Sequence, residues 1–193
     1  MTSIYIIGSL ANPEIPKVAA KLREADFDAF DQWHAVGPEG DRFWQEHFKA
    51  KGYNLAQALK MDFVQTAFNF DKKHLDRCEA AVLVLPAGKS GHLELGYVIG
   101  SGKPGFILME GDPERYDLMY GFATLCYSME ELISALGQRR TAWTGLATNT
   151  ASYASIPGSA SLEQSNRMLN WTDAQRHQVS DDDKVKNGTT STH

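Results

Sequence analysis

The sequence predicts an α/β fold, in which an open and mostly parallel sheet of five strands has helices on both faces. Three observations predict it. Short apolar segments alternate along the chain with longer segments of helical periodicity. The apolar segments read as fully buried strands, which is typical of a parallel sheet covered on both faces. Glycine closes several of the segments, as expected where one element passes into the next.

The first half of the chain contains two of the predicted strands and three helices. Residues 3–8, SIYIIG, form an apolar strand that ends at a glycine, and residues 13–25 follow as a helix whose apolar side chains share one face. Residues 27–31 read as a second strand. Residues 41–51 form an amphipathic helix that the next glycine ends. Residues 54–70 read as one further helix, with the initial asparagine as its N-cap.

The second half continues the alternation. Residues 80–86, AAVLVLP, are the strongest strand signal in the chain. Residues 91–102 follow as a helix closed by glycine, and residues 103–109 as the next strand. The remaining elements are a loop or short helix over 113–121, a strand over 122–128 and a helix over 129–137, capped by Ser128.

This order of elements favours a flavodoxin-like or Rossmann-like three-layer sandwich. In such sheets the ligand binds beyond the carboxyl ends of the strands, near the point where the strand order reverses. The segments that follow the first strand and the strand over 80–86 are therefore expected to form the site. They are GSLANP and PAGKSGHLE.

The chain has 193 residues, which is enough for one domain with a sizeable core and an appended segment. We expect a catalytic domain over residues 1–137. Beyond it the composition shifts to serine, threonine, asparagine and glycine, so residues 138–193 are expected to form a polar, partly disordered C-terminal tail.

Charge and composition argue against nucleic acid and membranes as partners of this protein. The net charge of −5 provides no basic field for nucleic acid or an anionic membrane. No apolar run approaches the roughly 20 residues of a membrane span, and the first residues lack the basic start of a signal peptide. Cys78 and Cys126 are too few for a disulfide framework or a metal set. We expect a cytoplasmic protein with a small-molecule ligand.

The residues Gly88, Lys89 and Ser90 match the end of a phosphate-binding P-loop motif, but the complete motif is absent. A Walker A loop has a glycine five positions before its second glycine, and Leu83 stands there in mid-strand. A weaker feature remains, because the free N–H groups of a helix that starts near Ser90 and Gly91 attract an anion. Alternatively, Ser90 is only an N-cap.

Glu94 lies in the first turn of the helix after the strongest strand. A glutamate here is stabilised by the helix dipole without any further role. Its turn also points towards the expected ligand crevice, where a carboxylate acts as nucleophile or base. The two interpretations stay open on position alone.

Three stretches resemble the nucleoside 2-deoxyribosyltransferase-like proteins, which include nucleoside 2′-deoxyribosyltransferases and 2′-deoxynucleoside 5′-monophosphate N-hydrolases. They are IYIIGSL, GHLELGY and GKPGFIL, and the resemblance extends over residues 3–136. It implies Glu94 as the nucleophile and Tyr5 as the residue that orients it. It also implies an upstream aspartate as proton donor, which is Asp71, with Asp76 as the rival.

The resemblance implies further contacts. Gly8, Ser9, Ser90 and Gly91 would surround the sugar or phosphate. Met119 and Tyr120 match a region with which a neighbouring subunit closes the site, which implies a homo-oligomer. Two positions depart from the pattern: Gly88 stands where many transferases have an aspartate, and no arginine follows Ser9.

Three more side chains are candidates from the residues themselves. Trp33 offers a face for a nucleobase and Asp31 a carboxylate for its edge, although a tryptophan that only covers the sheet edge fits as well. His92, two residues before Glu94, either lines the pocket or is an exposed or capping histidine.

The chemistry of an N-glycosidic bond agrees with two carboxyl groups. Positive charge develops on the sugar as the bond breaks, so one carboxylate captures the sugar, and the leaving base takes a proton from a second carboxyl of raised pKa. We therefore predict an enzyme of nucleotide salvage that cleaves a 2′-deoxynucleoside or its 5′-monophosphate, by transfer or hydrolysis, without metal or redox cofactor. The alternative is a non-catalytic nucleotide-binding or sensing module of the same fold.

Overall fold

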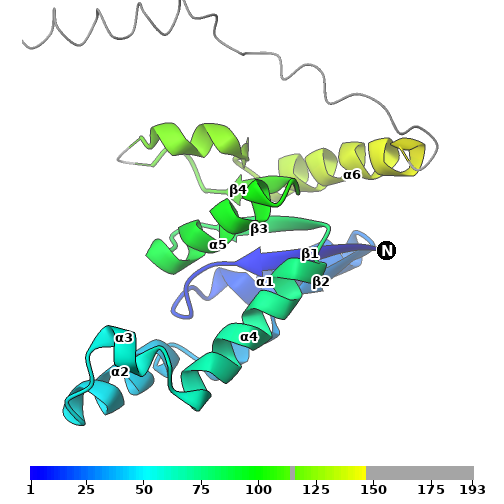
Figure 1. Cartoon of the computed structure of the whole chain (residues 1–193). Helices are drawn as coiled ribbons and strands as arrows, with labels where there is room; N and C mark the ends of the chain where they lie inside the picture. Colours follow the sequence, from blue (N-terminus) through cyan, green and yellow to red (C-terminus); the bar gives the residue numbers. More distant parts are fainter. Residues whose placement is uncertain (114–115, 147–193) are drawn as a thin grey trace, which may run out of the picture. The chain divides into compact units, whose positions relative to one another are not determined.

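The computed structural model describes residues 1–113 and 116–146, with side chains to residue 138, and contains a five-stranded sheet with helices on both faces (Figure 1). Every strand pair is parallel, and the strand order is β2-β1-β3-β4-β5. The predicted fold class is confirmed. The strands are β1 (Thr2–Ile7), β2 (Phe27–Phe30), β3 (Ala80–Val84), β4 (Gly105–Leu108) and β5 (Thr124–Cys126).

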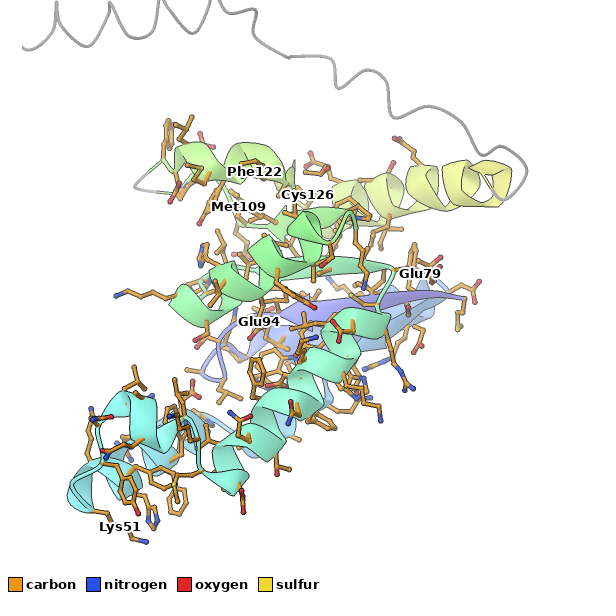
Figure 2. The ribbon with its side chains drawn as sticks, in the orientation of Figure 1. Lys51, Glu79, Glu94, Met109, Phe122 and Cys126 are labelled. Carbon is orange, nitrogen blue, oxygen red and sulfur yellow. The ribbon has the colours of Figure 1, made fainter. Side chains whose placement is uncertain are left out.

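The carboxyl edge of the sheet, and not its amino edge, contains the point where the strand order reverses. At the amino edge Glu79, just before β3, accepts a hydrogen bond of 2.8 Å from the Ser3 N–H (Figure 2). The strand order reverses between β1 and β3, which are neighbours although β2 lies between them in sequence. Their carboxyl ends therefore form the switch point at which α/β proteins bind ligands.

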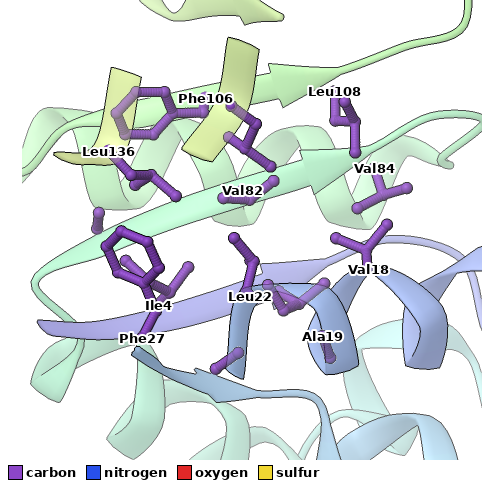
Figure 3. Packing of buried hydrophobic residues seen from close by; sticks show 14 of the residues in the cluster. Ile4, Val18, Ala19, Leu22, Phe27, Val82, Val84, Phe106, Leu108 and Leu136 are labelled. Atoms are coloured by element: carbon purple, nitrogen blue, oxygen red, sulfur yellow. The ribbon is translucent and has the colours of Figure 1, made fainter. Parts of the chain in front are cut away.

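Successive side chains of each strand point to opposite faces, which gives two cores. One core contains Ile4, Ile6 and Val82 of the sheet. Helix α1 (Glu14–Glu24) adds Ile15, Val18, Ala19 and Leu22 to it, and α6 (Met129–Leu146) adds Leu132 and Leu136 (Figure 3). The second core contains side chains from the central strands together with those of α4 (Asp62–Arg77) and α5 (Lys89–Gly100). Its central members are Tyr5, Ile7, Leu75, Leu83, Leu95 and Val98.

The predicted single helix over 54–70 is wrong. The structure has a short helix, α3 (Leu55–Ala58), and a separate α4, which begins after the extended Met61 and continues to Arg77. The turn between them lets Met61 pack on a small third cluster of Phe48, Ala58 and Val64. The predicted cap is confirmed: Asn54 forms a capping box with Gln57.

The other helices begin close to their predicted starts, and their ends differ more. Helix α2 (Gly40–Ala50) is followed by Gly52, whose φ of 78° ends it. The short 3₁₀ helices η1 (Gln32–Val36) and η2 (Leu118–Phe122) follow β2 and precede β5. Ser128 caps α6 by accepting a hydrogen bond of 3.2 Å from the Glu131 N–H, as predicted.

The predicted end of the last helix at Gly137 is wrong, because α6 continues to Leu146. Gly137 is absent from the residues of positive φ in the described part of the chain, so it does not form the left-handed cap that ends a helix. The remainder of the predicted tail, 147–193, lies outside the described residues.

Two features bring α5 and the loops of the carboxyl edge close to the strands. A Cβ on Gly105 of β4 would lie 2.6 Å from Ile99 and 2.8 Å from Leu95, so this glycine allows α5 to approach the sheet. The buried Asn12 side chain donates to the carbonyls of Val84 and Pro86, each at 3.5 Å, and thereby joins the loop after β1 to the loop after β3. None of the described helices is both long enough and apolar enough to cross a membrane.

Candidate active site

Glu94 lies in α5 in the region between α5 and α4 (Figure 2). Its side chain is half-buried, and burial raises its pKa to about 7, with smaller contributions from the negative charges of Asp71 and Asp41. Among the described residues, no hydrogen-bond donor or cation contacts its carboxyl group. A carboxylate in this setting costs folding free energy, which is typical of a group kept for function.

Asp71 reaches the same region from α4. Its carboxylate accepts a hydrogen bond from the Tyr5 hydroxyl, with 3.5 Å between the oxygen atoms. Burial raises the Asp71 pKa, the hydrogen bond from Tyr5 lowers it, and Asp41 raises it. Two carboxyl groups of one site thus come from neighbouring helices, with a buried tyrosine beside one of them.

Tyr5 contributes a phenol that does not ionise in the physiological range. Its ring is buried at the centre of β1, and burial, followed by the charges of Asp71 and Glu94, raises its pKa strongly. A neutral hydroxyl between two acidic groups donates one hydrogen bond, and in the structure Asp71 receives it. Tyr5 therefore favours the ionised form of Asp71 over that of Glu94.

The pKa shifts of the two carboxyl groups differ from the simplest expectation. The predicted proton donor, Asp71, has the smaller shift, whereas Glu94 has the larger. The reason is the hydrogen bond from Tyr5, which stabilises a negative charge on Asp71, while Glu94 lacks such a donor in the described part of the chain. When no substrate is bound, burial and the missing donor favour a proton on Glu94, whereas the Tyr5 hydroxyl favours the ionised form of Asp71.

Asp76, the rival to Asp71, lies elsewhere on α4. Its carboxylate is exposed, and Lys72 and Tyr97 both donate hydrogen bonds to it, which lowers its pKa. Five residues separate the two aspartates along the helix, so they lie about 140° apart around its axis. Only Asp71 is on the side of Tyr5.

Gly8 and Ser9 form the start of the loop after β1. A Cβ on Gly8 would lie 2.3 Å from Ile15, so glycine lets α1 pack closely here. The Ser9 hydroxyl accepts a hydrogen bond of 3.2 Å from the Ala11 N–H, which shapes the turn. This loop meets the loop after β3 through Asn12.

Helix α5 begins at Lys89 with Gly88 as its N-cap, so Glu94 lies in the second turn and not in the predicted first turn. The alternative in which Ser90 is the N-cap is also wrong. No side chain caps the helix, and Ser90 instead lies in its first turn. The first N–H groups of a helix have no partner within it. Gly91 is buried, and a Cβ there would lie 3.1 Å from both Ile7 and Leu83, which keeps this turn close to β1 and β3.

Asp31 and Trp33 are tied to neighbouring elements. Asp31 forms an ion pair with Arg23, which also donates to the Ala29 carbonyl at 2.7 Å. The Trp33 indole N–H donates to the Ile6 carbonyl at 2.7 Å, and its ring packs against both cores. These contacts correspond to the simpler interpretation, in which Trp33 covers the sheet edge.

His92 points away from the carboxylate pair and joins α5 to η2. Its Nδ1 lies 2.8 Å from the Gly88 carbonyl and its Nε2 lies 3.0 Å from the Tyr120 hydroxyl, so Nδ1 donates and Tyr120 donates to Nε2. Two pockets of about 710 and 740 Å³ meet at these two residues, and the second also has Met119 in its wall. Glu94 lines neither pocket, because it lies on the side of α5 that faces α4.

Comparison with known proteins gives structural neighbours only. No protein-family model matches the sequence, and no curated protein does. A 2-deoxyribosyltransferase from the psychrotolerant bacterium Bacillus psychrosaccharolyticus is 16% identical, with a TM-score of 0.46 over 68% of this chain and 90% of that one. A CMP N-glycosidase from Clostridium botulinum is 11% identical, with a TM-score of 0.40 over 70% and 99%. A conserved protein from Enterococcus faecalis V583 is 16% identical, with a TM-score of 0.49 over 72% and 99%.

Of these three neighbours, one is named as a 2-deoxyribosyltransferase and one as a CMP N-glycosidase. At these identities and TM-scores the likeness is one of chain path, and the activities belong to those proteins. The case for chemistry in this chain therefore depends on its own residues, above all on Glu94, Asp71 and Tyr5.

The structure adds aromatic side chains that the sequence analysis did not select. Phe30 stacks on Tyr5 with 5.4 Å between ring centroids and on His74 with 3.7 Å, and Phe70 lies 4.9 Å from His74. These rings form a continuous wall beside Asp71. Phe70 and His74 are one helical turn apart on α4, but the sequence analysis ended the predicted helix at residue 70, so this shared face was missed.

Proposed function

We propose that the chain cleaves the N-glycosidic bond of a 2′-deoxynucleoside or its 5′-monophosphate and passes the sugar to water or to a second base. The observation that carries the proposal is the pair of half-buried carboxyl groups, Glu94 and Asp71, with the Tyr5 hydroxyl on Asp71. The catalytic part would be residues 1–137, acting in the cytoplasm in nucleotide salvage. An unpaired glutamate of raised pKa supports a chemical role more than a purely structural one.

In the first step a carboxylate oxygen of Glu94 attacks C1′ of the sugar. The C1′–N bond breaks, its electron pair stays on the base nitrogen, and that nitrogen takes the proton of Asp71. The product is an ester between Glu94 and C1′. In the second step water or another base attacks C1′, gives a proton to the Asp71 carboxylate and releases Glu94, so that the configuration is retained overall.

This sequence of steps needs the proton on Asp71, whereas burial without a hydrogen-bond donor favours a proton on Glu94 in the substrate-free pair. Positive charge that develops at C1′ favours the ionised form of the adjacent Glu94. The transition state therefore shifts the proton towards Asp71, and Tyr5 orients the pair as the proton moves.

Other groups at the carboxyl edge support a phosphate or sugar hydroxyl. The first turn of α5 presents unpaired N–H groups around Ser90 and Gly91, and its dipole favours an anion. The loop with Gly8 and Ser9 lies across the switch point, because Asn12 holds it to the loop after β3. The wall of Phe30, Phe70 and His74 provides faces for a base. We propose that Asp31, Trp33 and His92 support the site indirectly by holding neighbouring elements in place. Asp31 pairs with Arg23, Trp33 donates to the Ile6 carbonyl, and His92 holds the Tyr120 hydroxyl.

The proposal is tested by turnover and by the site of the covalent intermediate. The purified chain is incubated with deoxynucleosides and their 5′-monophosphates, with and without a second base, and free or exchanged base is measured by chromatography. Brief exposure to substrate followed by acid quench and peptide mass spectrometry should place a deoxyribosyl adduct on Glu94. An adduct on Asp71 would reverse the roles of the two carboxyl groups. Binding without turnover would establish the sensing module instead.

We also propose that a second copy of the chain completes the site, because apolar side chains near α5 are unusually exposed. Leu93 is 77% exposed, Leu118 81% and Phe122 71%, and Met119 and Tyr120 lie between the last two. Such a patch is typical of a surface that another protein covers. The closed two-fold arrangement that is commonest among homo-oligomers would place η2 of each copy near the partner's site.

Leu118→Glu should convert this homo-oligomer to single chains. A charge in a covered apolar patch costs several kcal/mol of association free energy, so sedimentation analysis should give the mass of one chain and turnover should fall. Leu55→Glu, at a residue 67% exposed on α3, is the matched control and should change neither. A wild-type chain that sediments as a monomer would contradict the proposal.

A further inference from the structure

Three side chains form a closed cluster between α4 and α5 on the outer side of the molecule. The Tyr97 hydroxyl donates to Asp76 Oδ1 at 2.5 Å, and Lys72 Nζ donates to Asp76 Oδ2 at 2.6 Å. Lys72 Nζ also lies 3.1 Å from the Tyr97 hydroxyl and 5.3 Å from the centre of its ring. Each member thus contacts both others, and we call Lys72, Asp76 and Tyr97 the clamp.

A second link joins the same two elements. Lys103, just after α5, donates to the carbonyl of Leu75 at 2.9 Å and to that of Asp76 at 2.7 Å. Both carbonyls are in the last turn of α4, where a cation satisfies unpaired acceptors and interacts favourably with the helix dipole. The clamp and Lys103 therefore attach the end of α4 to the end of α5.

The clamp lies close to the carboxyl pair in the sequence of both helices. Tyr97 is three residues after Glu94 on α5, and Lys72 directly follows Asp71 on α4. In the described part of the chain no hydrogen bond joins Glu94 to Asp71. Their separation is consequently set by the separation of the two helices.

The carboxyl pair tends to separate the helices, and the clamp opposes this. The negative charges of Asp71 on α4 and Asp41 on α2 both act on Glu94 of α5, and the neutral Tyr5 hydroxyl of β1 donates to Asp71. Like charges in a half-buried region repel and draw in water. The clamp instead brings opposite charges and a phenol together across the same interface, one turn further along.

We propose that the clamp of Lys72, Asp76 and Tyr97 is a positioning device that fixes the distance between Glu94 and Asp71. The inference rests on the proposed function of that pair. Tyr97 belongs to the stretch ELGY that follows the strongest strand, so its hydroxyl acts through the helix that holds Glu94. We assign none of the three residues a contact with the substrate, so the clamp acts by positioning the catalytic groups.

The test is Tyr97→Phe, which keeps the ring and removes only the hydroxyl. Glu94 and Asp71 should then move apart and admit water, so kcat falls about tenfold with KM nearly unchanged. Carbon-13 NMR titration of the glutamate carboxyls, with Glu94 assigned by the Glu94→Gln variant, should show the Glu94 pKa fall from about 7 towards 4.5. A hydroxyl that only stabilises the fold would lower the melting temperature and leave this pKa unchanged.

Two further variants make the test specific. Tyr116→Phe removes a 3.3 Å hydrogen bond to Asp112 on the surface, a tyrosine–aspartate contact within one segment, and should change neither kcat nor the Glu94 pKa. Tyr97→Phe combined with Asp76→Asn should lose no more activity than the more affected single variant, because both break one unit. Additive losses would overturn the clamp as a unit.

The outcomes separate this inference from the function on which it rests. If wild type has no turnover but the Glu94 pKa falls in Tyr97→Phe, the proposed function is wrong and the clamp still positions the pair. If turnover is present and both kcat and the Glu94 pKa are unchanged in Tyr97→Phe, the positioning role is wrong and the proposed function stands.

Discussion

Glu94→Gln should stop turnover and, above pH 7, stabilise the folded chain by about 1–3 kcal/mol. Turnover should fall roughly 10³-fold or more, because the amide cannot form the ester with C1′. The stabilisation follows from the raised pKa of Glu94. The unfolded chain ionises this carboxyl near pH 4.5, whereas the folded chain ionises it only near pH 7. Wild type therefore loses stability as the pH rises from 4.5 to about 7, and the glutamine variant does not lose this contribution.

The full shift corresponds to about 3 kcal/mol, and partial exposure of the side chain reduces it. Urea unfolding of both proteins at pH 5 and pH 8 measures the effect as a difference in the free energy of unfolding. The gain should be clearly larger at pH 8. Glu24→Gln, an exposed glutamate on α1, is the control and should stay within a few tenths of a kcal/mol of wild type. A glutamine variant that is less stable at pH 8 would show that Glu94 has a stabilising partner.

Buried strands were the most predictable part of this fold. A strand covered on both faces must be apolar at nearly every position. The strands at Ile4–Ile7 and Ala80–Val84 can therefore be recognised in the sequence. The caps at Asn54 and Ser128 were equally predictable, because each needs only residues within its own turn.

Helix ends that are set by contacts with distant residues could not be predicted from the sequence. Between α3 and α4 no glycine or proline marks the break, and the turn exists because Met61 packs on Phe48, which lies on another helix. The last helix passes through Gly137, since a glycine ends a helix only when the backbone adopts a left-handed conformation there.

In the candidate site, too, features set by local sequence were predictable and features set by contacts between distant elements were not. The position of Glu94, on the helix that follows the strongest strand, was predicted from local sequence. The choice between Asp71 and Asp76 required the phase of α4, because the two lie about 140° apart on that helix. The order of the pKa shifts required a contact from another element, the Tyr5 hydroxyl on Asp71. Neither the clamp nor the nearby charge of Asp41 has a local signal, since each joins elements far apart in sequence.

Asp71→Asn should reduce kcat/KM at pH 7 by about 10²- to 10⁴-fold, which is the usual contribution of a general acid. The variant should also change the shape of the pH profile. In wild type the reactive pair carries one proton, so kcat/KM rises as the first proton leaves and falls as the second leaves near pH 7. With asparagine only Glu94 titrates. Its pKa falls because the neighbouring negative charge is gone, and kcat/KM should rise to a plateau without the alkaline decline.

A substrate whose base needs no proton distinguishes an acid from a structural residue. A 7-methylated purine deoxynucleoside carries a positive charge on its base and leaves without protonation, so the loss in Asp71→Asn should shrink to a few fold. Asp76→Asn is the matched isosteric control five residues along α4. It retains both titrating carboxyl groups of the site and should keep a bell-shaped profile, with the alkaline decline moved to lower pH because the clamp is weakened. An alkaline decline that disappears in Asp76→Asn and persists in Asp71→Asn would move the acid to Asp76 and remove the main reason for placing the chemistry between α4 and α5.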